Sequence, residues 1–281
     1  MNSSDYQHFI LTRFNLLLWN KAKDGRMVRT TKWLEHRFAL FEKFCLPSIK
    51  SQTCQDFDWI VLFDSMTPEL FKTRIAEFQM SCPQLIPVYV EPKDGRFFAE
   101  IFRAEMIKRL CAKRVVSTYL DNDDALNVRF VEDLQHRVRT LNDDTFIFYD
   151  EGYQYYTEDK YMMRIVYTKN HFVSVVEEGC PTTLKGIFGY GSHYYINKIK
   201  GAKIEHVKGL RMWCEVVHEK NVMNDAKFLR SKMVRNRDLL QREFAIDETV
   251  TSGIGLYLFD FLPRYGRSFA KRVRDYLLRK Y

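Results

Sequence analysis

The stretch that decides the fold is VVSTYLDNDDALNVRF, residues 115–130, in which an apolar run is followed directly by three carboxylates and an amide. The run Val115–Leu120 has the β-branched, apolar character of a buried parallel strand. Side chains alternate along a strand, so Asp121 and Asp123 should point to the same side, and Asp124 should begin a turn. Polar groups crowded at the end of a buried strand repel one another, which indicates either a metal site or a solvated turn.

Other segments of the first half repeat this pattern. Apolar runs that end in polar residues are separated by segments with apolar residues at helical spacing. Thr67 and Pro68 predict an N-cap and a first helical residue for the second of these helices. Strands that alternate with helices predict an α/β fold with a largely parallel sheet. The expected strands are residues 8–15, 58–64, 85–92 and 115–121, and the expected helices are residues 31–52, 68–82 and 97–113.

Polar residues follow the first two strands as well as the fourth. In sheets of this kind, ligands bind at the carboxyl ends of the strands. The polar residues at these ends should therefore converge on one rim with the acidic cluster; they are Thr12, Arg13, Asn15 and Asp64. The second half is less regular, with a helix expected over residues 128–141 and a hairpin or meander over residues 145–168. We expect this half to shape specificity.

The composition predicts one large domain. The chain has 281 residues, of which 46% are hydrophobic, and no repeat or linker marks a domain boundary. Its six cysteines lie far apart, without C-x-x-C or zinc spacing, so we expect reduced thiols. No stretch approaches the roughly 18 to 20 apolar residues of a membrane span, and the start lacks the features of a leader. We therefore expect a cytoplasmic protein.

The charge balance predicts an anionic partner. Lys and Arg number 44 against 36 Asp and Glu, a formal charge of +8, which favours a nucleotide, a nucleic acid or a membrane surface. Residues 251–281 are especially basic, and Phe269, Val273, Tyr276 and Leu277 share one helical face there. This tail predicts a basic amphipathic helix that either packs on the domain or rests on anionic lipid. No compact basic and aromatic motif supports nucleic-acid binding, so we expect no nucleic-acid partner.

The acidic cluster favours a metal over its alternatives. Carboxylates that converge at a strand end suit Mg²⁺ or Mn²⁺ with positions left open for phosphate oxygens. A helix cap near Asn127 would use only one or two of the four polar residues. A calcium loop of the EF-hand type is excluded, because Ala125 and Leu126 stand where an oxygen ligand and a glycine are required. An aspartyl-phosphate phosphatase or phosphotransferase, with Asp121 as nucleophile and Asp123 as acid and base, stays open.

Four stretches together carry a family resemblance: HFILTRFN (8–15), FCLPSIKSQTCQDFDWIVLFDSMTP (44–68), TYLDNDDAL (118–126) and MWCEVVHEKNVMN (212–224). The chain resembles nucleotide-sugar glycosyltransferases of the GT-A fold, and most strongly the bacterial "putative rhamnosyltransferase" family. The resemblance implies an α/β, Rossmann-like, mostly parallel central sheet flanked by helices, with a less regular C-terminal half and a basic C-terminal helix. One departure is Tyr119, which stands where the family has Arg.

The resemblance also implies roles for the polar residues. Asp123, Asp121 and His218 would hold Mn²⁺ or Mg²⁺, which neutralises the leaving diphosphate. Asp121 would also contact the ribose, and Asp124 the donor sugar. Thr12, Arg13, Asn15 and Asp64 would surround the base and the ribose. Glu177 or Glu178, in an expected loop near the site, would be the general base of an inverting enzyme, with Asp150 and Glu151 as competitors.

These inferences predict a metal-dependent glycosyltransferase. It would move a sugar, by resemblance rhamnose, from a nucleoside diphosphate sugar to a hydroxyl of a surface glycan or lipid-linked acceptor. Residues 1–281 would form a single domain, with a nucleotide-sugar-binding half (1–127), an acceptor-binding half (128–250) and a basic tail (251–281) in peripheral contact with anionic membrane. The phosphatase or phosphotransferase and a non-catalytic nucleic-acid-binding protein are the alternatives.

Overall fold

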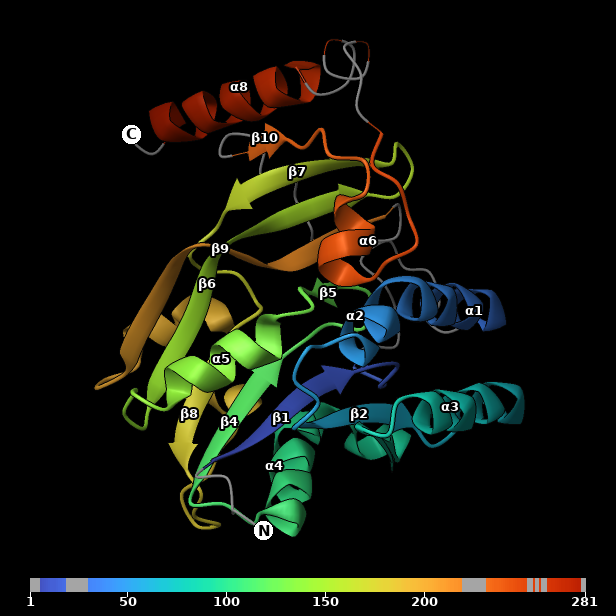
Figure 1. Cartoon of the computed structure of the whole chain (residues 1–281), viewed down its shortest axis with the longest axis vertical. Helices are drawn as coiled ribbons and strands as arrows, with labels where there is room; N and C mark the ends of the chain where they lie inside the picture. The colour runs from blue at the N-terminus through green and yellow to red at the C-terminus, as the bar shows by residue number, and fades with distance from the viewer. Residues whose placement is uncertain are drawn as a thin grey trace.

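The computed structural model describes residues 6–18, 30–218, 231–251, 255, 258 and 262–278, and its described strands form one mixed sheet (Figure 1). The order across this sheet is β10-β7-β6-β8-β4-β1-β2-β3, with β9 paired to both β6 and β5. The strands are β1 (Tyr6–Arg13), β2 (Asp58–Asp64), β3 (Leu85–Val90), β4 (Arg114–Tyr119), β5 (Ala125–Leu126), β6 (Thr145–Tyr156), β7 (Tyr161–Val166), β8 (Ser174–Glu178), β9 (Lys203–Val217) and β10 (Ser231–Met233).

The first four strands form the parallel sheet that the sequence predicts. β1 pairs in parallel with β2 and β4, and β2 pairs in parallel with β3. Alternate side chains of β1 enter two separate cores, because Ile10 faces one side of the sheet, whereas Phe9 and Leu11 face the other. The expected α/β architecture is confirmed, and each of these strands lies within two residues of its expected bounds.

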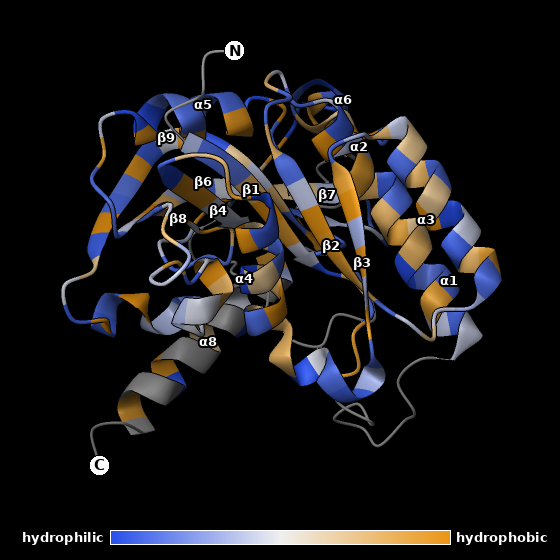
Figure 2. Cartoon of the chain, turned by 90° about the horizontal axis from the view of Figure 1, so that it is seen from below, coloured by the Kyte–Doolittle hydropathy of each residue, from blue (hydrophilic) through white to orange (hydrophobic). Residues whose placement is uncertain are grey.

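Helices cover both faces of this parallel half. The core around Ile10 lies beneath α1 (Thr31–Leu40), α3 (Glu69–Ser81) and α5 (Phe130–Val138), and the core around Phe9 lies beneath α4 (Phe98–Arg109). Seen from below, β2 and β3 lie between α4 on one side and α1 and α3 on the other, and these helices carry both polar and apolar residues (Figure 2). Burial on both faces explains why β1, β2 and β4 read as nearly continuous apolar runs.

Two helix details differ from the sequence-based expectation. The helix expected over residues 31–52 contains a π-helical turn, η1 (Phe41–Cys45), before α2 (Leu46–Lys50). The second helix has Pro68 rather than Thr67 at its N-cap, so the expected cap was wrong by one residue. The hydroxyl of Thr67 instead donates to the carbonyl oxygen of Asp64 at 2.6 Å. Thr67 therefore stabilises the turn that leaves β2.

The second half is mainly antiparallel. β6 and β7 form the expected hairpin, β8 pairs antiparallel with β4 and with β6, and β9 runs parallel to β6. Gly152 in β6 allows the ring of Trp213 to lie across the strand, because a Cβ at Gly152 would come within 2.2 Å of that ring. β5 follows the acidic cluster directly and pairs with β9. This pairing brings β9 beside the end of β4.

The remaining described helices are short or C-terminal. They are α6 (Leu239–Phe244), α8 (Leu262–Leu278) and the 3₁₀ helices η2 (Pro92–Phe97), η3 (Ile187–Tyr190) and η4 (His193–Lys198). Among them, η2 joins β3 to α4, and η3 packs on α4 and β4. In Figure 1, α8 lies at the end of the molecule that carries β10 and β7, away from α4. Across the described part of the chain, no helix combines the length and the apolar character needed to cross a membrane.

Candidate active site

The acidic cluster forms a tight turn where β4 ends. The N–H of Asp124 lies 3.3 Å from the carbonyl oxygen of Asp121 across this turn. Between them, Asn122 donates from its side chain to the carbonyl oxygen of Phe14 at 2.7 Å, which fastens the turn to the end of β1. The neighbouring Leu120 is fully buried and anchors the turn from the strand side. Asn122 and Leu120 therefore fix the turn at the ends of β1 and β4.

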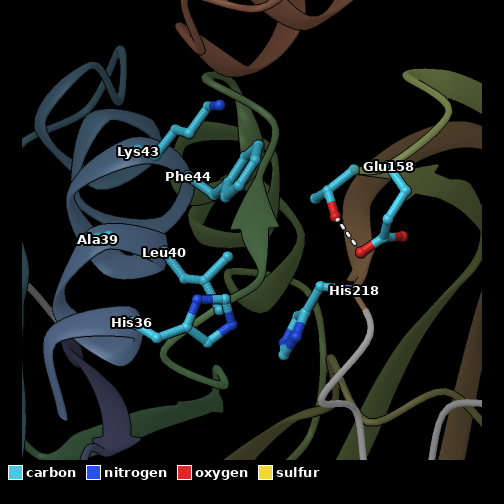
Figure 3. Close-up of a pocket in the computed structure, with 8 residues that line it drawn as sticks. His36, Ala39, Leu40, Lys43, Phe44, Glu158 and His218 are labelled. Carbon is cyan, nitrogen blue, oxygen red and sulfur yellow. Dashed lines mark hydrogen bonds between the residues drawn. The ribbon is translucent and has the colours of Figure 1, made fainter. Parts of the chain in front are cut away.

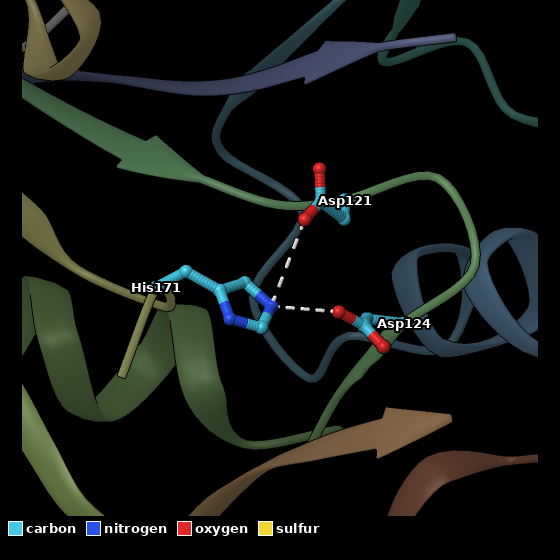
Figure 4. Close-up of side chains that lie close together, drawn as sticks. All are labelled: Asp121, Asp124 and His171. Atoms are coloured by element: carbon cyan, nitrogen blue, oxygen red, sulfur yellow. Dashed lines mark hydrogen bonds and ion pairs between the residues drawn. The ribbon is translucent and has the colours of Figure 1, made fainter. Parts of the chain in front are cut away.

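Asp121 and Asp124 converge on His171, which precedes β8 (Figure 4). Nε2 of His171 lies 2.7 Å from Oδ2 of Asp124 and 3.8 Å from Oδ2 of Asp121. One ligand atom from each of the three residues lies within 4.8 Å of the other two. The other oxygen of Asp124 accepts the N–H of Val216 in β9 at 2.8 Å, which fixes the orientation of this carboxylate.

The electrostatics of this trio favour a proton between Asp124 and His171. Burial alone would lower the pKa of His171, but the hydrogen bond and charge of Asp124, together with the charge of Asp121, raise it to about 9. Burial raises the pKa of Asp124 to about 7 against the opposing hydrogen bond and charge of His171, and the charges of Asp123 and Asp121 add to the rise. A divalent cation at this position would replace that proton.

Asp123 points to a different set of partners. Nη1 of Arg37, in α1, donates to its Oδ2 at 2.6 Å, and Nε2 of His218, at the end of β9, lies 3.0 Å from the same oxygen. Although burial opposes ionisation, Arg37 and His218 hold the pKa of Asp123 well below its usual range. The expected grouping of Asp121, Asp123 and His218 is therefore divided: Asp123 and His218 meet, and Asp121 lies with His171.

Arg13 lies beside Asp121, as its place at the end of β1 predicts. Its Nη2 donates to the hydroxyl of Tyr119 at 2.8 Å and lies 3.9 Å from Oδ1 of Asp121. The Tyr119 hydroxyl donates in turn to the same carboxylate oxygen at 2.8 Å. The guanidinium also stacks against Phe98 and Phe188, at 4.7 and 5.1 Å from the ring centroids. A guanidinium thus lies next to Asp121 although Tyr119 replaces the Arg of the family.

The other predicted rim residues are buried and bonded within the protein. Thr12 accepts the indole N–H of Trp59 at 2.9 Å. Asn15 accepts the N–H of Asp64 at 3.0 Å and donates to Thr67, and Asp64 accepts the N–H of Met66 at 2.7 Å. Thr12, Asn15 and Asp64 are each at most 5% exposed. The structure brings them to the predicted edge of the sheet, where they connect the ends of β1 and β2.

Glu177 and Glu178 do not lie beside the acidic cluster. They belong to β8 rather than to the expected loop, and they pair with Val115 and Arg114 at the start of β4, whereas Asp121 follows its end. Glu177 is buried and accepts the N–H groups of Lys185 and Gly186 at 2.9 and 2.8 Å. The expectation of a nearby loop was wrong, because β8 enters the sheet antiparallel to β4. Glu177 instead fixes the segment that leads to η3.

A pocket of about 200 Å³ opens on the side of the site where Asp123 lies (Figure 3). His218 and His36 face it, with their rings 5.3 Å apart, and they lie next to the Arg37–Asp123 pair. Lys43 and Glu158 give the pocket a charged rim, while Leu40 and Phe44 supply apolar walls. The site thus combines a carboxylate-rich centre with an adjoining pocket of mixed polarity.

Sequence reasoning missed two site residues. His171 has no partner at a recognisable spacing, because Asp124 lies 47 positions away along the chain. Arg37 is one of several basic residues on α1 and reads as part of a solvated helix face. The sequence signal for both is weak, since each joins the site only through the packing of distant elements.

Comparisons with known structures give distant likenesses. TarS of S. aureus matches over 75% of this chain and 37% of its own, with 11% identity and a TM-score of 0.38. Residues 1–349 of TarS match over 75% and 60%, with 12% identity and a TM-score of 0.39. A "putative nucleotide-diphospho-sugar transferase" from Desulfovibrio desulfuricans matches over 76% and 81%, with 12% identity and a TM-score of 0.36. The chain thus spans well under two thirds of the length of TarS.

The comparison with protein families is more direct. No curated protein matches the chain at a significant level. The model of the family described as "Putative rhamnosyl transferase" matches residues 7–228, which include β1, the acidic cluster and His218. This range covers most of the sequence and nearly all of the sheet. The chain therefore belongs to the putative rhamnosyl transferase family of glycosyltransferases.

Proposed function

We propose that the protein is a metal-dependent glycosyltransferase. It would move a sugar, rhamnose by its family, from a nucleoside diphosphate sugar to a hydroxyl group of a surface glycan or a lipid-linked acceptor. The observation that carries the proposal is the convergence of Asp121, Asp124 and His171 at the carboxyl end of β4, with the Arg13 guanidinium 3.9 Å from Asp121. Carboxylates and a fixed cation side by side suit a site that must hold both a metal and a diphosphate.

The donor atoms of this trio fit a divalent ion. Two carboxylate oxygens and one imidazole nitrogen within 4.8 Å of one another supply three ligands from one side. A nitrogen ligand favours Mn²⁺ over Mg²⁺, which prefers oxygen alone. When bound, the metal would neutralise the charge that develops on the leaving diphosphate. Compared with the set expected from sequence, this set keeps Asp121 and replaces Asp123 and His218 by Asp124 and His171.

The surrounding residues support the orientation of these ligands. Val216 donates its N–H to Asp124, and Tyr119 donates its hydroxyl to Asp121, so both carboxylates are held while one oxygen of each faces His171. Arg13 would attract the donor diphosphate electrostatically. The pairing of Asp123 with Arg37 would keep the turn between Asp121 and Asp124 in place.

We propose Glu215 as the general base, in place of Glu177 and Glu178. It lies in β9 next to Val216, and it is on the same side of the strand as Trp213, which stacks on Phe172 beside His171. The charge of Glu215 contributes to the raised pKa of His171. Gln154 donates to Glu215 at 2.6 Å and would hold the carboxylate in one orientation. A Glu215→Gln variant should then bind donor normally but transfer sugar at least roughly a hundredfold more slowly.

Each half of the chain would bind one of the two substrates. The parallel strands of residues 1–127 would carry the nucleotide sugar, and residues 128–250 would receive the acceptor, for which the pocket between His36, Lys43 and His218 is a suitable subsite. All six cysteines carry free thiols, which suits a reducing compartment and supports a reaction on the cytoplasmic side of the membrane.

The aspartyl-phosphate alternative has less support. Its mechanism needs Asp123 to donate and accept a proton beside Asp121. Asp123 is instead bonded to Arg37 and His218, and the lowered pKa of its carboxyl makes it a poor acid near neutral pH. No observation favours the nucleic-acid-binding alternative.

The proposal is tested by measuring sugar-nucleotide hydrolysis and transfer with Mn²⁺, with Mg²⁺ and with excess chelator. We expect turnover of one nucleoside diphosphate sugar, its loss in chelator and its recovery on adding Mn²⁺. An Asp121→Asn variant should lose turnover, whereas Asp247→Asn, a change of the same kind at an exposed position, should not. Full activity in excess chelator would refute the metal dependence, and turnover of simple phosphate esters through a trapped phosphoenzyme would favour the phosphotransferase.

A further inference from the structure

The C-terminal helix α8 presents an apolar stripe that the domain does not cover. Phe269, Val273 and Leu277 follow one another at intervals of four residues, which places them on one face of the helix. Their side chains are 57%, 42% and 55% exposed, and Leu262, about two turns earlier on that face, is 40% exposed. Every residue of α8 whose burial the structure describes is exposed. The stripe formed by Leu262, Phe269, Val273 and Leu277 is therefore not buried against the sheet.

The polar part of α8 is strongly basic. Five Lys or Arg and one Asp lie within its seventeen residues, LPRYGRSFAKRVRDYLL. Arg267 and Arg274 are exposed and lie about a third of a turn from the stripe of Phe269 and Val273, at 100° per residue. A helix with a basic face, an apolar face and low overall hydrophobicity is the kind that lies in the plane of a membrane interface. It is too polar to cross the membrane.

We propose that α8 binds the surface of an anionic phospholipid bilayer and holds the domain there. The apolar stripe would enter the boundary between headgroups and acyl chains, and the basic residues would contact the negatively charged headgroups. The charge of the helix decides between this occupant and a second copy of the chain, because two helices with this excess of Lys and Arg repel each other when their apolar faces meet. An anionic bilayer can contact the basic face of α8 with its headgroups and the apolar face with its acyl chains.

The position of α8 in the molecule agrees with such a contact. It lies beyond β10 and β7, at the opposite end from α4, so a flat surface can approach its exposed side (Figure 1). This proposal does not depend on the metal site or on the identity of the sugar.

The test is flotation of the full chain with vesicles of phosphatidylcholine alone and of phosphatidylcholine mixed with phosphatidylglycerol. We expect binding only to the anionic vesicles, with a decrease as the salt concentration rises. The double variant Phe269→Glu/Leu277→Glu should lose at least about tenfold in affinity. The double variant Arg267→Gln/Lys271→Gln should bind anionic vesicles about thirtyfold more weakly at low salt.

Two controls keep the outcome clear. Met80→Glu removes a side chain that is 76% exposed on α3, away from α8, and should leave vesicle binding unchanged. Circular dichroism of each variant should match that of the wild-type chain. Equal binding to neutral vesicles, or no binding to either kind, would overturn the proposal. So would a wild-type dimer, detected by light scattering, that the Phe269→Glu/Leu277→Glu variant converts to monomers without any vesicle binding.

Discussion

Nη1 of Arg37 lies 2.6 Å from Oδ2 of Asp123, so the carboxylate that the sequence favours as a metal ligand is already neutralised by a helix cation. Nε2 of His218 lies 3.0 Å from the same oxygen. Asp121 and Asp124, on either side of Asp123, face His171 instead. The acidic turn therefore has two functions, since one carboxylate anchors it to α1 and two are available to a ligand.

Breaking the anchor should destabilise the protein. Asp123 and Arg37 are only 13% and 26% exposed, so Arg37→Met leaves a carboxylate poorly solvated and should lower the free energy of unfolding by about 2 kcal/mol. Asp123→Asn should cost a similar amount, and the double variant clearly less than the sum. Urea denaturation of the four proteins measures this coupling. Strict additivity would show that the pair contributes nothing to stability.

The same pair should show a pH dependence of a definite sign. The pKa of Asp123 is lower in the folded protein than in the unfolded chain, so its contribution to stability is complete above about pH 4 and decreases as the pH falls further. In the Arg37→Met variant, the free energy of unfolding should decrease less as the pH falls below about 4. An unchanged acid slope between the two proteins would contradict the assignment.

His8 should make the protein sensitive to mild acid. It is 1% exposed in β1, it bonds through Nε2 to the hydroxyl of Thr118 at 2.9 Å, and burial lowers its pKa to about 3. Below about pH 6.5 the unfolded chain binds a proton that folded His8 does not, so stability should fall by about 1.4 kcal/mol per pH unit.

The comparison that isolates His8 is unfolding by urea at pH 7.5 and pH 5. The wild-type chain should lose about 2 kcal/mol more between these values than the His8→Asn variant. His136→Asn, at an exposed position of α5, should behave like the wild type. Equal losses in all three proteins would show that His8 titrates normally.

Cys180 should be a reactive thiol near neutral pH. Hydrogen bonds from the side chain and backbone of Thr182, and from Thr183, lower its pKa to about 7, and its sulfur lies 3.0 Å from the Thr182 hydroxyl. Alkylation by iodoacetamide at pH 7, followed by peptide mass spectrometry, should modify Cys180 several times faster in the wild type than in Thr182→Val. Cys111, which is exposed, serves as the internal reference. An equal rate of Cys180 alkylation in the wild type and in Thr182→Val would contradict this prediction.

Glu177 should matter for folding more than for chemistry. Its carboxylate accepts two backbone N–H groups and the hydroxyl of Tyr190 at 3.1 Å. Glu177→Gln should therefore lower the free energy of unfolding by roughly 1 to 3 kcal/mol while changing kcat less than about fivefold. Glu178→Gln, at an exposed position, should change neither quantity measurably. A large loss of kcat with unchanged stability in Glu177→Gln would restore the residue as a catalytic candidate.

The parallel half could be predicted from sequence because its signals are local. Each strand from β1 to β4 is an apolar run bounded by polar residues, and β1, β2 and β4 are buried on both faces, so the sequence pattern alone locates these strands. The acidic turn was found for the same reason, since Asp121–Asp124 follow such a run directly. Arg13 was also placed correctly, because residues at the ends of neighbouring parallel strands meet.

The rest depends on contacts between distant segments. His171 reaches Asp124 because the backbone N–H of Tyr119 bonds to the carbonyl oxygen of Val173, which holds the segment before β8 against the end of β4. Glu177 was misplaced because β8 is only five residues long and is followed by turn residues, so it reads as part of a loop. No local sequence pattern predicts that β8 pairs antiparallel with β4. This pairing places Glu177 and Glu178 beside the start of β4 and not beside its end.

The most direct test of the central claim is a Mn²⁺ titration followed by electron paramagnetic resonance, with no donor present. We predict one bound Mn²⁺ per chain, an affinity at least about tenfold weaker in Asp124→Asn and in His171→Phe, a clearly smaller loss in Asp123→Asn, where only the anchor of the turn is weakened, and unchanged binding in the Asp247→Asn control. If binding is instead lost in Asp123→Asn and in His218→Phe while Asp124→Asn binds normally, the metal lies between Asp123 and His218, and the assignment made from the structure is wrong.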